Sequence, residues 1–488
     1  MSLKNKAVTG VIWTSINQFG QMFIQFFVGL VLARLLRPED YGLMAMTTVM
    51  IAFSAVISEG GIGLAIVQRK NLDDDDCSTA FWLNAGASLG MYGIMFLCAP
   101  LLAQFYNEPS LTLLLRVAGL RVLLGGLCTC HFARLERDMA FRQATIVQLP
   151  SFVIGAVLAI WMAYTGWGVW ALVALSLFTG LAGTIASWLV SGWIPRWRFR
   201  RSSMREMIGF GLNMTGERLL ETIFTNIYVL VIGKYFSPLQ VGYYNRAQQF
   251  QNLPSTAINS VFIRVLMPMF STIQADREKL RAGFMQSLTL ATMASFPIFA
   301  GMAAVAQPMV VCLIGQKWEP CVPYLQILCF MGAFIPIHAL NVTAILSQGR
   351  SGLSFHISIY KKLLVIVAIV FTVGHGIIPM LWGQLVVAIL SMFINIWPNR
   401  SLLGISMREQ IAVFTPYLVL SMAMGFGVWW LTLALPLPAA GQLAAGVLAG
   451  AVIYGLGLRF IHRPAHKQIA DLMERLPGIG PVARFVLT

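Results

Sequence analysis

Three ionisable side chains, Glu217, Arg218 and Glu221, lie within one short stretch that is otherwise largely apolar. The stretch covers residues 207–236 and is long enough to cross a membrane as a helix. Each charge at the centre of such a helix costs about 2.5 to 3.5 kcal/mol on insertion scales. A helix that carries three of them is therefore expected to face water, a ligand or opposite charges.

The polar residues of this stretch follow the period of a helix. Asn213, Glu217 and Glu221 recur every four residues and form one stripe, and Arg218 is offset from Glu217 by about 100°. We expect the stripe to line a substrate-binding cavity, in which Arg218 contacts an anionic group and Glu217 or Glu221 exchanges a proton or a cation. The alternative is a set of ion pairs that fixes helix packing.

The first apolar run carries a polar stripe without charge. Asn17, Gln21 and Gln25 are spaced at i, i+4 and i+8. Amides form hydrogen bonds with hydroxyl-rich ligands, and they join neighbouring helices in membranes equally well. Both interpretations stay open for this stripe, which we include in the candidate cavity.

Further charges fall inside apolar runs. Arginine suits phosphate because its planar guanidinium binds two oxygens and stays charged. Glu59 precedes two glycines and is a candidate for ion coupling, together with Glu217 and Glu221, or else the partner of an arginine. The remaining cavity candidates are basic residues, for which packing roles or snorkelling to the membrane surface are the alternatives: Arg116, Arg121, Arg264 and Lys361.

Composition sets the class of protein that must position these residues. Of the 488 residues, 58% are hydrophobic and 11% are charged, whereas soluble domains carry about 25% charged residues. Apolar runs of spanning length recur throughout and predict an all-α polytopic membrane protein with about fourteen transmembrane helices. The net charge of +15 lies mainly in loops, so it does not indicate nucleic acid. The sequence shows no phosphate-binding glycine loop, metal-ligand spacing or catalytic set, so we predict a transporter rather than an enzyme.

The basic residues also predict orientation. Alternate loops carry most of the Lys and Arg residues, which places both termini in the cytoplasm. The run Asp73-Asp74-Asp75-Asp76 is expected to be a solvated cytoplasmic loop. The tail at 461–488 has apolar residues at helical spacing and is predicted to lie on the inner membrane surface as an amphipathic helix.

A weak internal repeat has an offset of 200 residues. Pro38 and Gly42 recur as Pro238 and Gly242, and the same offset relates the amide stripe to the charged stripe. This predicts two six-helix lobes in a parallel-repeat arrangement, at 1–200 and 201–405, followed by an extra helix pair at 406–460. Transporters of this design bind their substrates near the middle of the membrane, between the repeats.

Six motifs, in order along the chain, resemble those of a known family. The chain is similar to the bacterial polysaccharide flippases of the multidrug/oligosaccharidyl-lipid/polysaccharide exporter superfamily, in particular its colanic-acid and O-antigen branch. The motifs are LARLLRPEDYG at 32–42, GLAIVQRK at 63–70, VGYYNRA at 241–247, LMPMFS at 266–271, GQKW at 315–318 and QGR at 348–350.

The resemblance implies a substrate and a cellular setting. An undecaprenyl-diphosphate-linked oligosaccharide would be moved by alternating access from the cytoplasmic to the periplasmic leaflet of the bacterial inner membrane, for a cell-surface polysaccharide. It implies no cofactor beyond coupling to H⁺ or Na⁺, and its partners would be membrane lipids, a polysaccharide polymerase and export machinery. The last two helices would hold the polyprenyl tail. A drug/cation antiporter of the same superfamily is the alternative, and a polysaccharide polymerase or ligase is a more distant one.

Overall fold

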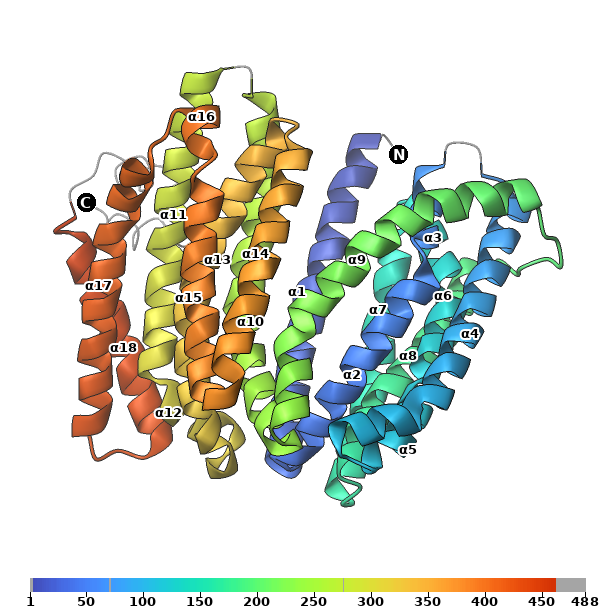
Figure 1. Cartoon of the computed structure of the whole chain (residues 1–488), viewed down its shortest axis with the longest axis horizontal. Coiled ribbons are helices and arrows are strands. Elements are labelled where there is room, and N and C mark those ends of the chain that lie inside the picture. Colours follow the sequence, from blue (N-terminus) through green and yellow to red (C-terminus); the bar gives the residue numbers. More distant parts are fainter. Residues whose placement is uncertain (1–2, 70–71, 275, 462–488) are drawn as a thin grey trace. The chain divides into compact units, whose positions relative to one another are not determined.

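The computed structural model describes residues 3–69, 72–274 and 276–461, and every regular element in these residues is a helix (Figure 1). The chain divides into two compact units, unit 1 (Met1–Asn245) and unit 2 (Arg246–Thr488). The boundary lies within α10 (Pro238–Thr272), whereas the repeat divides the chain near residue 200. The three-part division at 200 and 405 remains a prediction. The predicted amphipathic tail lies outside the described residues from 462 onward.

Unit 1 is a bundle of long helices with two short ones, α3 and α5. Its most extensive helix pairs are α7 with α8, α1 with α7, α4 with α6, α6 with α8, and α2 with α9. Besides the first residues of α10, the helices are α1 (Leu3–Leu35), α2 (Pro38–Glu59), α3 (Ile62–Gln68), α4 (Asp74–Tyr106), α5 (Ser110–Ala118), α6 (Leu120–Arg137), α7 (Phe141–Tyr164), α8 (Val169–Ser191) and α9 (Arg201–Tyr235).

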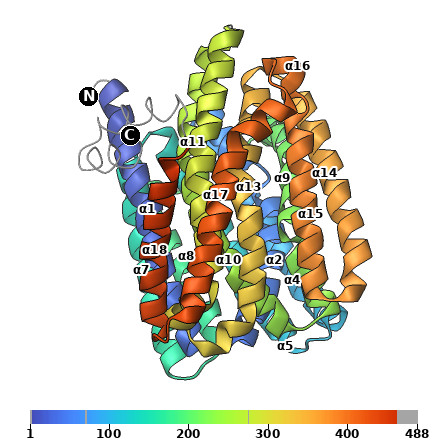
Figure 2. The ribbon, with the colours of Figure 1, turned by 90° about the vertical axis from the view of Figure 1, so that its left-hand side faces the viewer.

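Unit 2 is built around α11, which packs against both α13 and α17; Figure 2 shows these three as long neighbours. Besides the rest of α10, its helices are α11 (Arg277–Ala304), α12 (Ala306–Ile314), η1 (Gln316–Cys321), α13 (Val322–Ser347), α14 (Ser351–Thr372), η2 (Val373–His375), α15 (Ile377–Ile396), α16 (Asn399–Leu403), α17 (Met407–Ala434) and α18 (Ala439–Leu458).

Among the described residues, twelve helical segments are long and apolar enough to cross a membrane. They match twelve of the fourteen predicted spans. The other two predicted spans are α9 and α10, which have 35 residues each and carry the charged stripe and Arg264. A helix of that length reaches about 50 Å, which exceeds the bilayer core of about 30 Å. Fourteen spans therefore remain a prediction.

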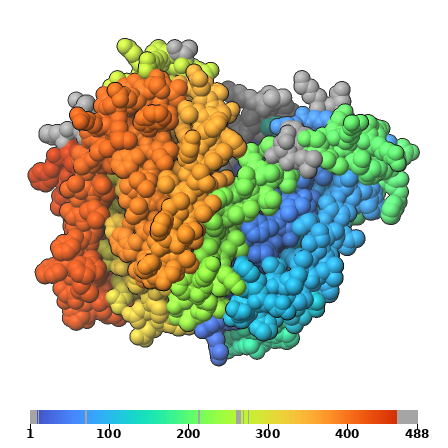
Figure 3. All heavy atoms as spheres, in the orientation of Figure 1, coloured from blue at the N-terminus to red at the C-terminus, as the bar shows by residue number. Residues whose placement is uncertain are grey.

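Large apolar side chains cover the outside of the helices. On α14, Val370 and Phe371 are 67% and 73% exposed, and α14 and α15 lie at the surface of the face drawn in Figure 3. Such an apolar exterior would aggregate in water and is suited to lipid. The chain is a multi-pass membrane protein.

The two turns of the internal repeat lie against each other. A Cβ atom on Gly42 would lie 1.7 Å from the carbonyl oxygen of Pro238, and one on Gly242 would lie 2.0 Å from that of Pro38. The contact is reciprocal, with each glycine of one turn facing the proline of the other. It accounts physically for the recurrence of proline and glycine at the same offset, since no side chain fits at either glycine.

Candidate functional site

Two glycines end α2 and bring α9 against it. Gly60 and Gly61 have φ angles of +52° and +66°, which glycine adopts at little cost. The predicted second span, 41–67, is therefore broken into α2 and α3. A Cβ atom on Gly211 of α9 would lie 1.8 Å from the Gly60 carbonyl oxygen, so the two backbones touch. This contact places the middle of α9 beside the end of α2.

Three charged side chains from three helices gather at this junction. Nη1 of Arg218, on α9, lies 4.0 Å from Oε2 of Glu59, which is the last residue of α2. The positive charges of Arg218 and of Arg121, on α6, both act on Glu59. Arg121 packs over Gly180 of α8. A Cβ atom added to Gly180 would lie only 3.0 Å from the Nε of Arg121. We call Glu59, Arg121 and Arg218 the charge cluster.

The charge cluster is open to binding. The side chains of Arg218 and Glu59 are 48% and 46% exposed, and their ion pair is at the limit of contact. Two guanidinium groups act on one carboxylate, so with Glu59 ionised these three groups carry a net charge of +1. Such an arrangement attracts an anion, and the planar guanidinium of arginine can bind two oxygens of a phosphate.

The rest of the charged stripe is described only in part. Glu217 and Glu221 are both exposed on α9. The side chains of Asn213 and of Arg264, on α10, lie outside the described residues. The structure therefore shows Arg218 in an ion pair with Glu59, and it leaves the ligand contacts of the stripe as a prediction.

The amide stripe of α1 packs mainly against α7. Asn17 Nδ2 and Gln21 Nε2 both donate to Oε1 of Gln148, at 2.7 Å and 2.9 Å. Gln21 Nε2 also lies 3.3 Å from Asn17 Oδ1. This arrangement joins helices, as one of the two interpretations expected, whereas Gln25 is exposed and can meet a ligand. Gln148 was not predicted, although a glutamine within the apolar run at 145–164 was the signal available.

Two other predicted basic residues lie elsewhere. Arg116 on α5 stacks over the ring of Phe96, at 4.4 Å from its centroid, and its Nε donates to the Phe96 carbonyl at 3.4 Å. Lys361 on α14 belongs to unit 2 and lies within electrostatic reach of His338, whose Nδ1 accepts from Asn395. Neither is part of the charge cluster. Their binding roles remain predictions.

The expectation of a solvated loop at residues 73–76 is wrong. Asp73 caps α4, and the next three aspartates form its first turn, where the helix dipole favours negative charge. Asp76 is buried and accepts from Ser203 Oγ. Each aspartate pairs with an arginine from another segment: Arg200–Asp73 at 2.8 Å, Arg134–Asp74 at 2.9 Å, Arg198–Asp75 at 3.3 Å and Arg69–Asp76 at 3.4 Å.

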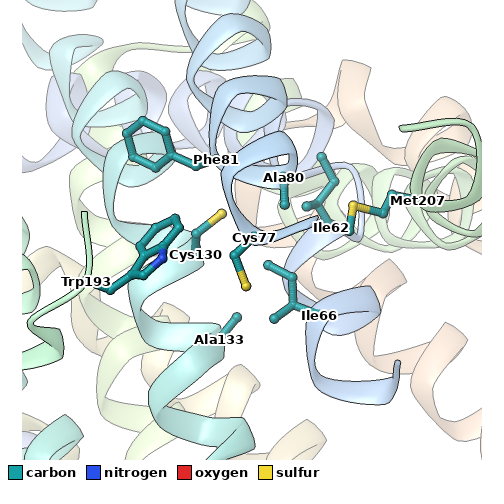
Figure 4. Close-up of a cluster of buried hydrophobic side chains, with 9 residues drawn as sticks. All are labelled: Ile62, Ile66, Cys77, Ala80, Phe81, Cys130, Ala133, Trp193 and Met207. Carbon is teal, nitrogen blue, oxygen red and sulfur yellow. The ribbon is translucent and has the colours of Figure 1, made fainter. Parts of the chain in front are cut away.

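An apolar core adjoins these ion pairs. Figure 4 shows Cys77 and Phe81 of α4 close to Cys130 of α6, with Met207 of α9 beside Ile62 of α3. The start of α9 is thus held by packing as well as by charge. Among the described residues, no group of three or more His, Cys, Asp or Glu side chains is arranged to hold a metal ion.

Replacing Asp73 by asparagine should make stability depend on pH in a defined direction. The N–H of Asp76 and, less strongly, Arg200 hold the pKa of Asp73 below its usual value of 3.8. Its charge therefore stabilises the fold above that pH, and the effect is lost as the pH falls through the lowered pKa. Because asparagine still caps a helix, Asp73→Asn isolates the charge.

We expect Asp73→Asn to melt below wild type at pH 7, with the difference closing as the protein is acidified. Thermal unfolding in detergent at a series of pH values measures this. Asp138→Asn, at an exposed aspartate of the same unit, is the control. If the melting temperatures of Asp73→Asn and wild type differ by the same amount at pH 7 and pH 3, the charge effect is ruled out.

Fold and charge together define the class: a multi-pass helical membrane protein with a cationic junction inside its first unit. The chain belongs to a family described as polysaccharide biosynthesis protein, whose model matches residues 31–323. It is 28% identical to the lipopolysaccharide biosynthesis protein WzxC of Escherichia coli K12, over 87% of this chain and 89% of that one. It is 26% identical to the succinoglycan biosynthesis transport protein ExoT of Rhizobium meliloti, over 98% of each.

Solved structures share the fold. The lipid II flippase MurJ, in an inward closed conformation, matches with a TM-score of 0.75 at 13% identity, over 93% of this chain and all of that one. An inward-facing multidrug resistance transporter of the MATE family matches with a TM-score of 0.57 at 15% identity, over 81% of this chain and 99% of that one. The helical architecture predicted from sequence is thereby confirmed.

Proposed function

We propose that the protein flips an undecaprenyl-diphosphate-linked oligosaccharide from the cytoplasmic to the periplasmic leaflet of the bacterial inner membrane. It works as a transporter, by alternating access, and supplies glycan for a cell-surface polysaccharide. The observation that carries the proposal is the charge cluster, in which Arg218 pairs with the carboxylate of Glu59 and the charge of Arg121 also acts on it. Membership of a polysaccharide biosynthesis family and the names of its relatives support the substrate class.

The charge cluster suits the diphosphate of such a lipid. With Glu59 ionised, the three groups carry a net charge of +1, and a diphosphate that displaces Glu59 from Arg218 gains charge-assisted hydrogen bonds. The loose ion pair, at 4.0 Å, makes this exchange easy. A drug/cation antiporter would need a net negative site instead, so the cluster favours the flippase over this rival.

Glu59 also offers a means of coupling. A carboxylate released from Arg218 by the substrate can take up a proton or a sodium ion, and so link glycan movement to an ion gradient. Glu217 and Glu221 are the further candidates. Both termini are proposed to be cytoplasmic, and a polysaccharide polymerase with export machinery would receive the glycan on the outer side.

Flipping can be measured in proteoliposomes that contain the oligosaccharide lipid. A membrane-impermeant oxidant destroys the glycans exposed on the outside, so a working flippase lets it reach those of the inner leaflet as well. We expect wild-type vesicles to lose nearly all glycan. Arg218→Ala should slow the loss by about 10- to 100-fold, the value of one charge-assisted contact. The rate of glycan loss with Arg218→Lys should lie between those of wild type and Arg218→Ala, since lysine keeps the charge but lacks the planar guanidinium that binds two oxygens.

The controls separate transport from leakage and from misfolding. Arg350→Ala, at an exposed arginine of unit 2, should flip like wild type at equal protein level. Imposed H⁺ and Na⁺ gradients test the coupling. Glycan loss from wild-type vesicles no faster than from empty ones would refute the proposal, and gradient-driven export of a lipophilic cation by the same vesicles would establish the antiporter.

A further inference from the structure

Unit 2 contains two adjoining cavities, which are lined in part by α17 and α18, the helices that the resemblance assigns to the polyprenyl tail. One has a volume of about 420 Å³ and the other about 310 Å³, and both fall in the range of small-molecule sites. Ala304, Gln326 and Trp429 line both, so the two lie side by side. The larger cavity is lined almost wholly by apolar side chains, and the smaller one is lined by several amides and a carboxylate.

The larger cavity lies between helices at hydrocarbon depth. It is lined by α11, α13, α15 and α17, from Ala304 at the end of α11 to Met422, which is twelve residues before the end of α17. Twelve residues of helix correspond to about 18 Å, roughly half the thickness of a bilayer core. Met422, Trp382 and Phe426 are 45%, 50% and 67% exposed, so the cavity opens toward lipid.

The smaller cavity lies at the ends of the same helices and is rich in hydrogen-bond acceptors. Three glutamines that line it use their Nε2 groups to bind protein oxygens: Gln307 donates to Glu319 at 2.9 Å, Gln326 to the Ala303 carbonyl at 3.3 Å, and Gln442 to the Leu435 carbonyl at 3.1 Å. Each amide therefore keeps its carbonyl oxygen as an acceptor, together with a second N–H. These amides and the carboxylate of Glu319 belong to the residues that line the cavity.

This lining selects a cation that carries several donors. An ammonium group has three N–H donors and no acceptor, which complements a carboxylate surrounded by amide oxygens. Trp429, at the junction of the two cavities, adds an aromatic face for a cation and the indole that proteins place at membrane interfaces. Among the described residues that line this cavity none is Lys or Arg, so it is a poor match for a diphosphate.

We propose that the two cavities form a binding site for one phospholipid with a primary amine in its head group, such as phosphatidylethanolamine. A hydrocarbon chain occupies the apolar cavity, and the ammonium group lies against Glu319 among the amide oxygens. The lipid comes from the leaflet at the Trp429 end of the helices. This lipid is distinct from the transported glycan lipid and does not depend on the proposed function.

Native mass spectrometry of the full-length protein tests this directly. The protein is reconstituted with an equimolar mixture of phosphatidylethanolamine, phosphatidylcholine and phosphatidylglycerol of identical chains, and the retained lipid is identified. We expect phosphatidylethanolamine to dominate, and its addition to detergent-solubilised wild type to raise the melting temperature more than phosphatidylcholine does. That second measurement needs no variant.

Two variants separate the head-group site from the chain site. Glu319→Gln should lower the preference for phosphatidylethanolamine over phosphatidylcholine by about tenfold, as expected for a lost charge-assisted contact. Met422→Trp should fill the apolar cavity and reduce retention of all three lipids. The matched controls are Glu278→Gln, at an exposed glutamate in the first turn of α11, and Val419→Trp, one turn away on α17 at a position that is 61% exposed. Both should behave as wild type.

Three results would overturn the site. Wild type retaining phosphatidylcholine as well as phosphatidylethanolamine would remove the head-group selection. An unchanged preference in Glu319→Gln would exclude the carboxylate. Displacement of phosphatidylethanolamine by equimolar undecaprenyl-diphosphate oligosaccharide would assign the cavities to the transported substrate.

Discussion

Gly42→Ala is expected to destabilise the protein by about 3 kcal/mol, since the added methyl group overpacks a site that has no room for it. The new Cβ would lie 1.7 Å from the Pro238 carbonyl oxygen. A clash with a side chain can be relieved by a rotamer change, but this one is with backbone, so α2 or α10 must move. For a unit of this size, that loss corresponds to a melting temperature lowered by roughly 6 to 12 °C.

The reciprocal contact provides an internal check. Gly242→Ala should have a comparable effect, because its Cβ would lie 2.0 Å from the Pro38 carbonyl oxygen. Gly90→Ala is the matched control: Gly90 lies inside α4 with open space around it, and alanine is the better helix former. Fluorescence-detected thermal unfolding in detergent compares the three. A melting temperature for Gly42→Ala equal to that of Gly90→Ala would show that the two turns do not touch.

Hydropathy predicts the helices of this chain well, because a helix satisfies its own backbone in lipid whatever its neighbours are. It cannot locate breaks that depend on single residues. The second predicted span contains Gly60 and Gly61, and only the structure shows that both adopt positive φ and divide it into α2 and α3. The repeat identified the two Pro-Gly turns from their spacing, but nothing in the spacing says that they meet.

Partners far apart in sequence were harder to predict. Gln148 is 131 residues from Asn17, and Arg200 is 127 residues from Asp73. Four successive aspartates suggest a solvated loop when no partner is known, and the arginines that pair with them come from three separate segments of unit 1. Sequence spacing gives the face of a helix on which a side chain lies, whereas packing decides what that face meets.

The same limit applies to the candidate site. Intramembrane charge is visible in the sequence because its cost is large, and Glu59, Arg121 and Arg218 were all identified in this way. Arg116 was identified by the same criterion, yet it stacks on Phe96. Arg116 and Arg121 lie on neighbouring helices and differ only in what tertiary packing places beside them. The effect of this difference on transport can be measured.

Arg121→Ala is expected to slow glycan flipping by about 10- to 100-fold, the contribution of one charge-assisted contact. Without Arg121, Glu59 and Arg218 form a neutral pair, and the junction loses its net attraction for a diphosphate. Arg116→Ala should flip within about twofold of wild type, since its contacts are an aromatic ring and a backbone carbonyl outside the charge cluster. The proteoliposome assay, at equal protein level, compares them.

A second substitution separates an electrostatic role for Arg121 from a packing role. Arg121 fills the space over Gly180, so its loss could also loosen α6 against α8. Adding Glu59→Gln to Arg121→Ala restores a net positive charge through Arg218 without restoring any packing. We expect this double variant to recover part of the lost flipping rate, whereas a packing defect would leave it as slow as Arg121→Ala. Equal loss in Arg116→Ala and Arg121→Ala would likewise contradict the assignment, because only one of these arginines acts on Glu59.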